Sequence, residues 1–175
     1  QPALLNYGSS GNGSSTHLAT ELFKATAGTP ITHIPFNGAG PSVTAMLSGQ
    51  IQVLFMVPLT AQPHIRTGRL RALAVTSARR SDLMPELPTA SEAGATGYES
   101  GAWYGVVVPA RTPQNIVTQI NRDIASVLKS KEMRERMNNQ GFEVVASSPA
   151  EFAGFIRAEL PKWAQAVKVS GARVD

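Results

Sequence analysis

A glycine-rich loop near the start of the chain separates a short apolar segment from an amphipathic helix. The loop runs from Tyr7 to His17 and reads Tyr7-Gly8-Ser9-Ser10-Gly11-Asn12-Gly13-Ser14-Ser15-Thr16-His17. Glycine lets a backbone approach a ligand closely, and a helix N-terminus presents unpaired N–H groups and a partial positive charge. A strand over 4–7, this loop and a helix over about 14–27 therefore predict a site for a small anion such as a carboxylate or phosphate.

A flexible linker is the other interpretation of the same glycine and serine content. The position of the loop between a strand and a strongly periodic helix favours the anion site. Its glycine spacing is G-x-x-G-x-G, which differs from the dinucleotide-binding pattern, and no lysine follows the last glycine as in a P-loop. No serine lies in the G-x-S-x-G elbow of an α/β-hydrolase.

Composition limits the class of protein further. The 175 residues are 42% hydrophobic and 16% charged, as in a globular protein of one domain or slightly more. The absence of cysteine excludes disulfides and thiolate chemistry, and no apolar run approaches the ~18 residues of a membrane span. The net charge of +4 favours anionic ligands. Five basic residues lie between Arg66 and Arg80 without the aromatic residues that bind nucleic acids, so we expect a solvated rim there.

Strand and helix patterns alternate along the first hundred residues, which predicts an α/β fold with a largely parallel sheet. We expect further strands at 31–35, 51–55 and 70–75, and helices from Pro41 to about residue 48, from about 58 to 66, and around 89–93. An extended segment at 98–109 comes next, followed by helices from residue 112 and at 131–140 and a strand at 142–146. A capping box at Ser148–Glu151 opens the last helix, in which Pro161 predicts a kink. Residues 1–101 read as one compact α/β unit and 102–175 as part of a second.

A second glycine loop, Phe36-Asn37-Gly38-Ala39-Gly40, precedes Pro41 at a predicted helix start. Carboxyl ends of parallel strands meet at one edge of a sheet, so both loops are expected to face the same anion there. His17 is either a donor to an anion or to the loop, or a capping, half-buried residue. His33 alternates with Ile31 and is expected at the surface, and His64 lies near a helix end. No metal-binding spacing, paired acid–base carboxylates or nucleophile with its base is present.

Several segments together resemble the TctC-type (Bug) periplasmic solute receptors of the tripartite tricarboxylate transporters. They are the loop at 7–18, His33–Pro41, Gly68–Thr76, Leu87–Gly94, Trp103–Gly105 with Pro109–Pro113, and Ile156–Leu160 with Lys162-Trp163. The resemblance covers essentially the whole chain in matching order and spacing.

This resemblance implies a type II periplasmic-binding-protein fold whose two lobes close on a carboxylate. Residues 1–101 would be the second lobe, and 102–175 the hinge strand and the C-terminal part of the first lobe, whose N-terminal part is lacking. The implied ligand-binding residues are Gly8, Ser9, Ser10, Gly11, Gly13, Ser14, His17, Asn37, Gly38, Ala39, Met56, Trp103 and Tyr104. The position of Met56 is often polar or acidic in relatives, so a recognition point for an amino or hydroxyl group would be lost.

The expected function is a non-enzymatic, periplasmic receptor without a cofactor, which delivers a small carboxylate to membrane subunits of a transporter and binds no nucleic acid. The alternatives are a carboxylate sensor without a transporter, an α/β enzyme in which only His17 offers acid–base chemistry, and the sensing domain of a transcription regulator. The last requires a helix-turn-helix, which the chain lacks. With one wall of the cleft absent, we expect weak or no solute binding by the chain alone, and self-association through apolar surface on 102–175.

Overall fold

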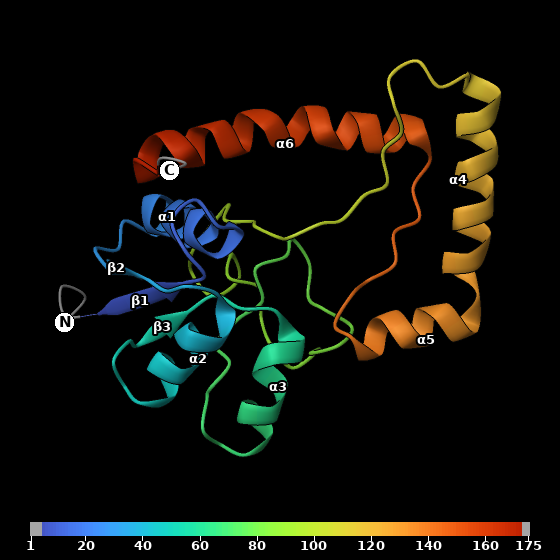
Figure 1. The fold of residues 1–175 in the computed structure, drawn as a ribbon. Helices are drawn as coiled ribbons and strands as arrows, with labels where there is room; N and C mark the ends of the chain where they lie inside the picture. Colours follow the sequence, from blue (N-terminus) through green and yellow to red (C-terminus); the bar gives the residue numbers. More distant parts are fainter. Residues whose placement is uncertain (1–4, 173–175) are drawn as a thin grey trace. The chain divides into compact units, whose positions relative to one another are not determined.

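The computed structural model describes residues 5–172, apart from the side chain of Val169. Its elements in chain order are β1 (Asn6–Ser9), α1 (Ser15–Ala27), β2 (Thr32–Pro35), α2 (Ala39–Leu47), β3 (Val53–Leu54), α3 (Pro58–Arg66), α4 (Gln114–Lys129), α5 (Lys131–Asn139) and α6 (Pro149–Ser170) (Figure 1). Within the described part, no helix is both long enough and apolar enough to cross a membrane.

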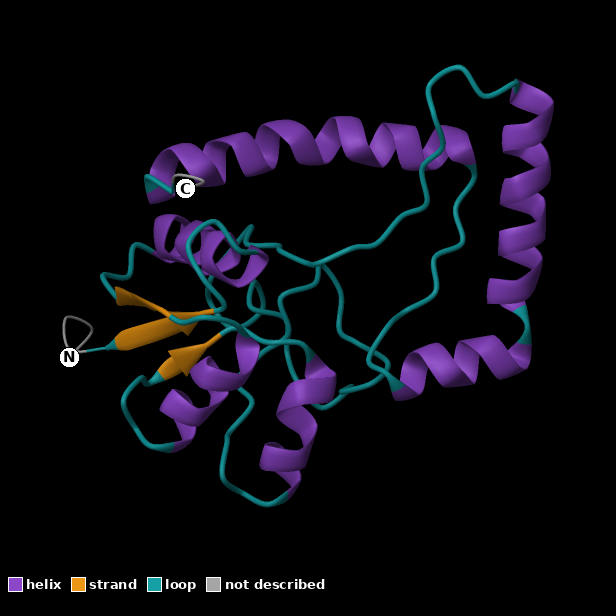
Figure 2. Ribbon diagram, in the orientation of Figure 1, coloured by secondary structure: helices purple, strands orange, loops and turns teal. Residues whose placement is uncertain are grey.

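The chain divides into two compact units. Residues 1–102 and 163–175 form the first unit, which holds the sheet, and residues 103–162 form the second, which is helix and irregular chain (Figure 2). The sequence predicts a boundary between two ligand-binding lobes at residue 101. A division into compact units does not test a lobe boundary, so that boundary stays a prediction.

Three parallel strands in the order β2-β1-β3 make the sheet of the first unit. β1 lies in the centre, with Tyr7 opposite His33 on one side and Val53 on the other. Because β2 lies on one side of β1 and β3 on the other, the connections β1–β2 and β2–β3 run across the sheet in opposite directions. Right-handed crossovers therefore place α1 and α2 on opposite faces of the sheet. Figure 1 shows this arrangement. Both faces of the short sheet are therefore covered.

Local sequence explains the helix ends of this unit. The Ser14 hydroxyl accepts the His17 N–H at the start of α1, and Gly28 ends that helix in the left-handed conformation with a φ of 63°. Pro58 is the first residue of α3, as predicted. The second helix begins at Ala39, two residues earlier than predicted, so Pro41 occupies its third position, where a backbone N–H has no partner within the helix in any case.

The core of the first unit has two parts. Tyr7, Ile31 and Ile51 are buried around the sheet. A second cluster centres on Tyr98, whose hydroxyl donates to the Ala19 carbonyl over 3.0 Å. The Tyr98 ring makes an edge contact with Phe23 at 5.4 Å between centroids, and so joins the irregular segment after α3 to helix α1.

Several predicted elements are absent or shorter, and the reason is a lack of pairing partners. Residues 70–75 were expected to be a buried strand, but only Val75 is paired, in a single parallel bridge to Thr89, and Leu73 is 70% exposed. The strand expected at 142–146 is wrong as well, because Ala146 has a φ of 49°, which interrupts an extended run. The helix expected at 89–93 is only a turn, closed by the Ala93 N–H donating to the Thr89 carbonyl.

The third strand is confirmed but consists of Val53 and Leu54 alone, and the first ends at Ser9, two residues later than expected. Leu4, with which the first strand was expected to start, lies outside the described residues. The segment 98–109 belongs to no strand. Backbone hydrogen bonds between strands require a neighbour at the right distance, and the hydrophobic pattern alone does not supply one.

The second unit contains helices but no buried core. α4 and α5 have the predicted positions, and the capping box opens α6, with the Ser148 N–H donating to the Glu151 carboxylate over 2.8 Å. None of residues 103–162 is buried. Large apolar side chains are exposed along the unit: Trp103, Tyr104, Val106, Val107, Ile116, Val127, Phe142, Val145, Phe155 and Leu160. Four helical turns without a buried side chain indicate that the stripe of α4 packs against little.

Gly8 is required by packing in the central strand, which gives a first prediction. A Cβ at this position would lie 2.4 Å from Cδ1 of Ile51, which is 1% exposed. We expect Gly8→Ala to lower the free energy of unfolding by about 1–3 kcal/mol, the usual cost of overpacking. Chemical denaturation measures this.

Gly40 offers the control, because a Cβ there meets nothing within 4 Å and the residue lies in a helix. Gly40→Ala should leave stability unchanged or raise it by about 0.5–1 kcal/mol. Equal effects of the two substitutions would show that the contact with Ile51 is unimportant.

The exposed apolar surface of the second unit leads to a second prediction. Exposed apolar surface of this kind favours association, so we expect sedimentation velocity to show concentration-dependent oligomers. Replacing Val107, which is 78% exposed, with Asp should shift the distribution toward monomer. A sharp monomer peak for the unmodified chain at all concentrations would contradict the expectation.

Candidate functional site

The carboxyl ends of all three strands meet at one edge of the first unit. β1 continues into the loop at 10–14, β2 into the loop at 36–38, and β3 into residues 55–57. With the order β2-β1-β3, the chain changes direction at β1, and ligands in open α/β sheets bind beside such a switch point. The glycine-rich loop after β1 lies at that position.

Hydrogen bonds within the first loop hold it in one conformation. The Ser14 N–H donates to the Gly11 carbonyl over 3.2 Å, and the Gly11 N–H donates to the Ser9 hydroxyl over 3.2 Å. The Thr16 hydroxyl accepts the Ser10 N–H over 3.0 Å. Gly11 has a φ of 132°, a value open essentially to glycine alone, so the loop requires glycine there.

The second loop is joined directly to the first. The Gly38 N–H donates to the Ser10 carbonyl over 3.2 Å, and the Phe36 N–H donates to the Ser9 carbonyl over 3.2 Å. Gly38 has a φ of 105° and begins α2 without a side-chain cap. These hydrogen bonds hold the two loops next to each other, and with them the N-termini of α1 and α2.

Unpartnered backbone donors remain at both helix starts. The N–H groups of Asn12, Ser15, Thr16, Asn37 and Ala39 donate no hydrogen bond to any of the residues that the structure describes. Such groups, at the positive ends of two helix dipoles, favour a negatively charged ligand. The edge can thus bind a carboxylate through main-chain donors, without a charged side chain.

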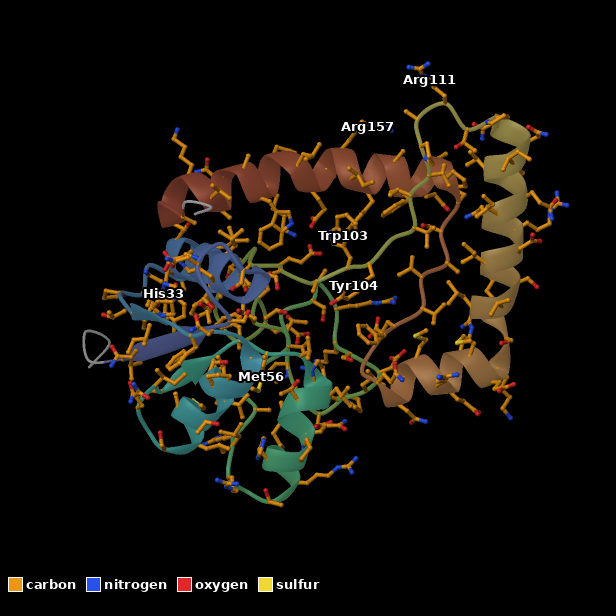
Figure 3. All side chains as sticks on the ribbon, viewed as in Figure 1. His33, Met56, Trp103, Tyr104, Arg111 and Arg157 are labelled. Carbon is orange, nitrogen blue, oxygen red and sulfur yellow. The ribbon has the colours of Figure 1, made fainter. Side chains whose placement is uncertain are left out.

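Two stacked imidazoles lie beneath the first loop. The rings of His17 and His33 are 4.0 Å apart, and His33 also stacks on Tyr7 at 4.8 Å. His17 accepts the Gly13 N–H at Nδ1 over 3.0 Å, and Nε2 of His33 lies 2.7 Å from the Ser9 hydroxyl. Figure 3 labels His33 in this part of the unit. Both imidazoles therefore contact the loop from its buried side.

A buried carboxylate completes this polar cluster. Glu21 accepts hydrogen bonds from the Tyr7 hydroxyl and from Lys24, whose Nζ is 2.8 Å away. Burial and the hydrogen bond to Glu21 both raise the pKa of Tyr7. Burial lowers the pKa of His17 below its ordinary value, although the Glu21 carboxylate opposes the shift. Burial and the adjacent His17 lower the pKa of His33 to about 4, so the pair is uncharged near neutral pH.

The residues predicted to bind ligand are found in two places. The loop residues Ser9, Ser10, Gly11, Gly13, Ser14, Asn37, Gly38 and Ala39 lie together at the edge, and Met56 lies at the same edge two residues after β3. Gly8 lies within β1, packed against Ile51, and His17 lies behind the loop with 4% of its surface exposed. The structure thus gathers most of the predicted set around the two loops.

Trp103 and Tyr104 belong to the second unit (Figure 3). The Trp103 ring makes edge contacts with Phe152 and Phe155 of α6, at 5.6 and 5.4 Å between centroids. Tyr104 contacts Phe142 and is 80% exposed. Their part in a ligand site stays a prediction.

Three residues with a clear place at the site escaped sequence reasoning. His33 was expected at the surface, but it is only partly exposed, and its ring stacks on both Tyr7 and His17. Thr16 and Glu21 were not singled out, yet Thr16 bonds Ser10 in the loop and Glu21 bonds Tyr7. For His33 the available signal was the parallel sheet, because helices cover both faces of such a sheet.

The parallel sheet and the two joined loops define the class of protein as an α/β protein with an anion-binding edge. The profile of the tripartite tricarboxylate transporter family receptor (TctC) matches residues 1–171, and the chain belongs to this family. It is 37% identical over 162 residues to Protein BugT of Bordetella pertussis, covering 93% of this chain and 50% of that protein. The chain spans about half the length of the first curated relatives it matches.

Solved structures agree with this assignment. A protein from R. palustris, solved with adipate, superposes with a TM-score of 0.82 at 35% identity, over 98% of this chain and 57% of its own. MatC from Rhodopseudomonas palustris, with bound malate, gives a TM-score of 0.75 at 29% identity, over 95% of this chain and 57% of its own. The family consists of receptors rather than enzymes. The α/β binding-protein fold is therefore confirmed, as a part of such a protein.

The low pKa of His33 predicts that acid destabilises the first unit. An imidazole whose pKa falls from 6.5 to about 4 on folding contributes stability that is present above pH 6.5 and is lost as the pH falls toward 4. The loss should be on the order of 1–3 kcal/mol. Denaturant unfolding of the unmodified chain and of His33→Gln between pH 7.5 and 4.5 measures it.

Glutamine cannot be protonated, so the unfolding free energy of the variant should fall less steeply with acid. The carboxylates of the chain are common to both proteins and cancel in the difference. Parallel pH profiles for the two proteins would contradict a depressed pKa at His33.

Proposed function

We propose that this chain forms one side of the carboxylate site of a periplasmic receptor that delivers its solute to a tripartite tricarboxylate-type transporter. The observation that carries the proposal is the pair of joined glycine loops, with unpartnered N–H groups of two helix N-termini at one sheet edge. A carboxylate suits these donors because it accepts several hydrogen bonds with one charge. Relatives of this chain have been solved with adipate and with malate, both carboxylates.

Recognition through main-chain donors leaves selection among carboxylates to the surrounding side chains. Met56 and Phe36, both partly buried, flank the loops with apolar surface. Met56 offers no hydrogen bond to a hydroxyl or amino substituent beyond its weakly accepting sulfur. We therefore propose that unsubstituted dicarboxylates such as adipate are preferred over hydroxylated ones such as malate.

Binding is tested on the chain by ¹H–¹⁵N NMR during titration with adipate and with malate. We expect the amide resonances of Asn12, Ser15, Thr16 and Asn37 to move first, with a dissociation constant roughly in the millimolar range, since one edge supplies a few kcal/mol at most. Amide resonances that do not move at high adipate concentration, or that move only in the second unit, would overturn the proposed site.

A glycine substitution supplies the matching prediction. Gly38→Ala places a side chain at a φ of 105° at the start of α2 and should weaken adipate binding by about tenfold or more, because the second loop must shift. Gly28→Ala, at a φ of 63° at the end of α1, carries a comparable backbone cost of about 1–2 kcal/mol away from the edge. It should lower stability and leave the affinity unchanged.

A further inference from the structure

His17 contacts the first loop from the buried side of the loop, where it can control the conformation of the loop. It is the third residue of α1, its surface is 4% exposed, and its Nδ1 accepts the Gly13 N–H over 3.0 Å. An imidazole that accepts at Nδ1 carries its single proton on Nε2 and is uncharged. The hydrogen bond to Gly13 therefore exists in the neutral form alone.

Burial opposes a positive charge on this imidazole, and the first turn of α1 adds the positive end of the helix dipole. The uncharged His33 ring of β2 stacks on it at 4.0 Å. The ammonium of Lys24, on the same helix, adds to this opposition and lies over the ring of Tyr7 of β1, 5.6 Å from its centroid, in a cation–π contact. Glu21 is the one carboxylate that favours the charged form, and it already accepts from Tyr7 and Lys24.

Gly13 connects the loop to the start of α1. It has a φ of 70° and precedes Ser14, the cap of α1, while the unpartnered donors Asn12, Ser15 and Thr16 flank it on both sides. A protonated Nδ1 would place an N–H against the Gly13 N–H, and two donors repel. Release of Gly13 would therefore move the donors that the anion requires.

We propose that His17 is a positioning residue of the anion site: its uncharged imidazole, stacked on His33, holds Gly13 and the loop donors in place, and its protonation releases them. The proposal rests on the proposed function for the identity of the ligand, but the link between His17 and the loop stands on geometry alone. A consequence is that acid weakens anion binding. The opposite holds for a histidine that contacts the anion as a cation, since acid would then strengthen binding.

The first test needs no ligand. In the ¹⁵N-labelled chain, the amide resonance of Gly13 should follow the titration of the His17 imidazole, whose Nδ1 should be unprotonated at pH 7.5. His17→Asn keeps an acceptor near the position of Nδ1 and cannot be protonated, so this amide should become insensitive to pH over the same range. His64→Asn, a substitution in α3 outside both loops, should leave the behaviour of the unmodified chain unchanged.

The second test uses adipate at pH 7.5 and at a pH below the titration found for His17. We expect the unmodified chain to lose about tenfold in affinity in acid, the equivalent of one pKa unit, and His17→Asn to lose clearly less. Because adipate itself takes up protons equally in both experiments, the difference belongs to His17. His17→Leu, which lacks the acceptor, should bind weakly at both pH values if it folds.

The two proposals fail separately. Gly13 amides that follow His17 in a chain to which no carboxylate binds would overturn the proposed function and support the positioning role. Adipate binding that is equally pH-dependent in the unmodified chain and in His17→Asn, or that strengthens in acid, would overturn the positioning role and leave the receptor function intact.

Discussion

The central position of β1 between two parallel neighbours is the constraint on which the first unit depends. Its backbone bonds to β2 and β3 bring three carboxyl ends to one edge, and the direction change at β1 places the glycine-rich loop at the switch point. Gly8 allows the side chain of Ile51 to pack against this strand. A strand of four residues can therefore organise two helix N-termini.

Behind this edge lies a largely buried polar cluster, beside the apolar core of the sheet. Tyr7, His17, His33 and Glu21 come from β1, α1 and β2, and each bonds or stacks with another member. A buried polar group is costly unless it is paired. The loop bonds to the cluster through Ser9 and Gly13, so the arrangement of the cluster and the conformation of the loop depend on each other.

The second unit has the opposite character. α5 and α6 are capped by serine side chains and α4 is strongly patterned, yet none of residues 103–162 is buried, and the aromatic residues mainly contact one another. Local signals are sufficient to form helices, whereas a core needs enough surrounding chain to exclude water. The solved relatives have chains nearly twice as long. The part of each relative that superposes on this chain, both units together, makes up 57% of its structure.

The sequence by itself determined what depends on neighbours in the chain: the helices with their caps, the glycine loops and the alternation that predicts a parallel α/β sheet. Tertiary structure alone decided which extended segments pair. Residues 70–75 and 142–146 have strand-like patterns but almost no partner, because pairing is a property of two segments. Tertiary structure also decided that His33 stacks on His17 beneath the loop. The sequence of β2 alone does not tell which helix will pack on each face of the sheet.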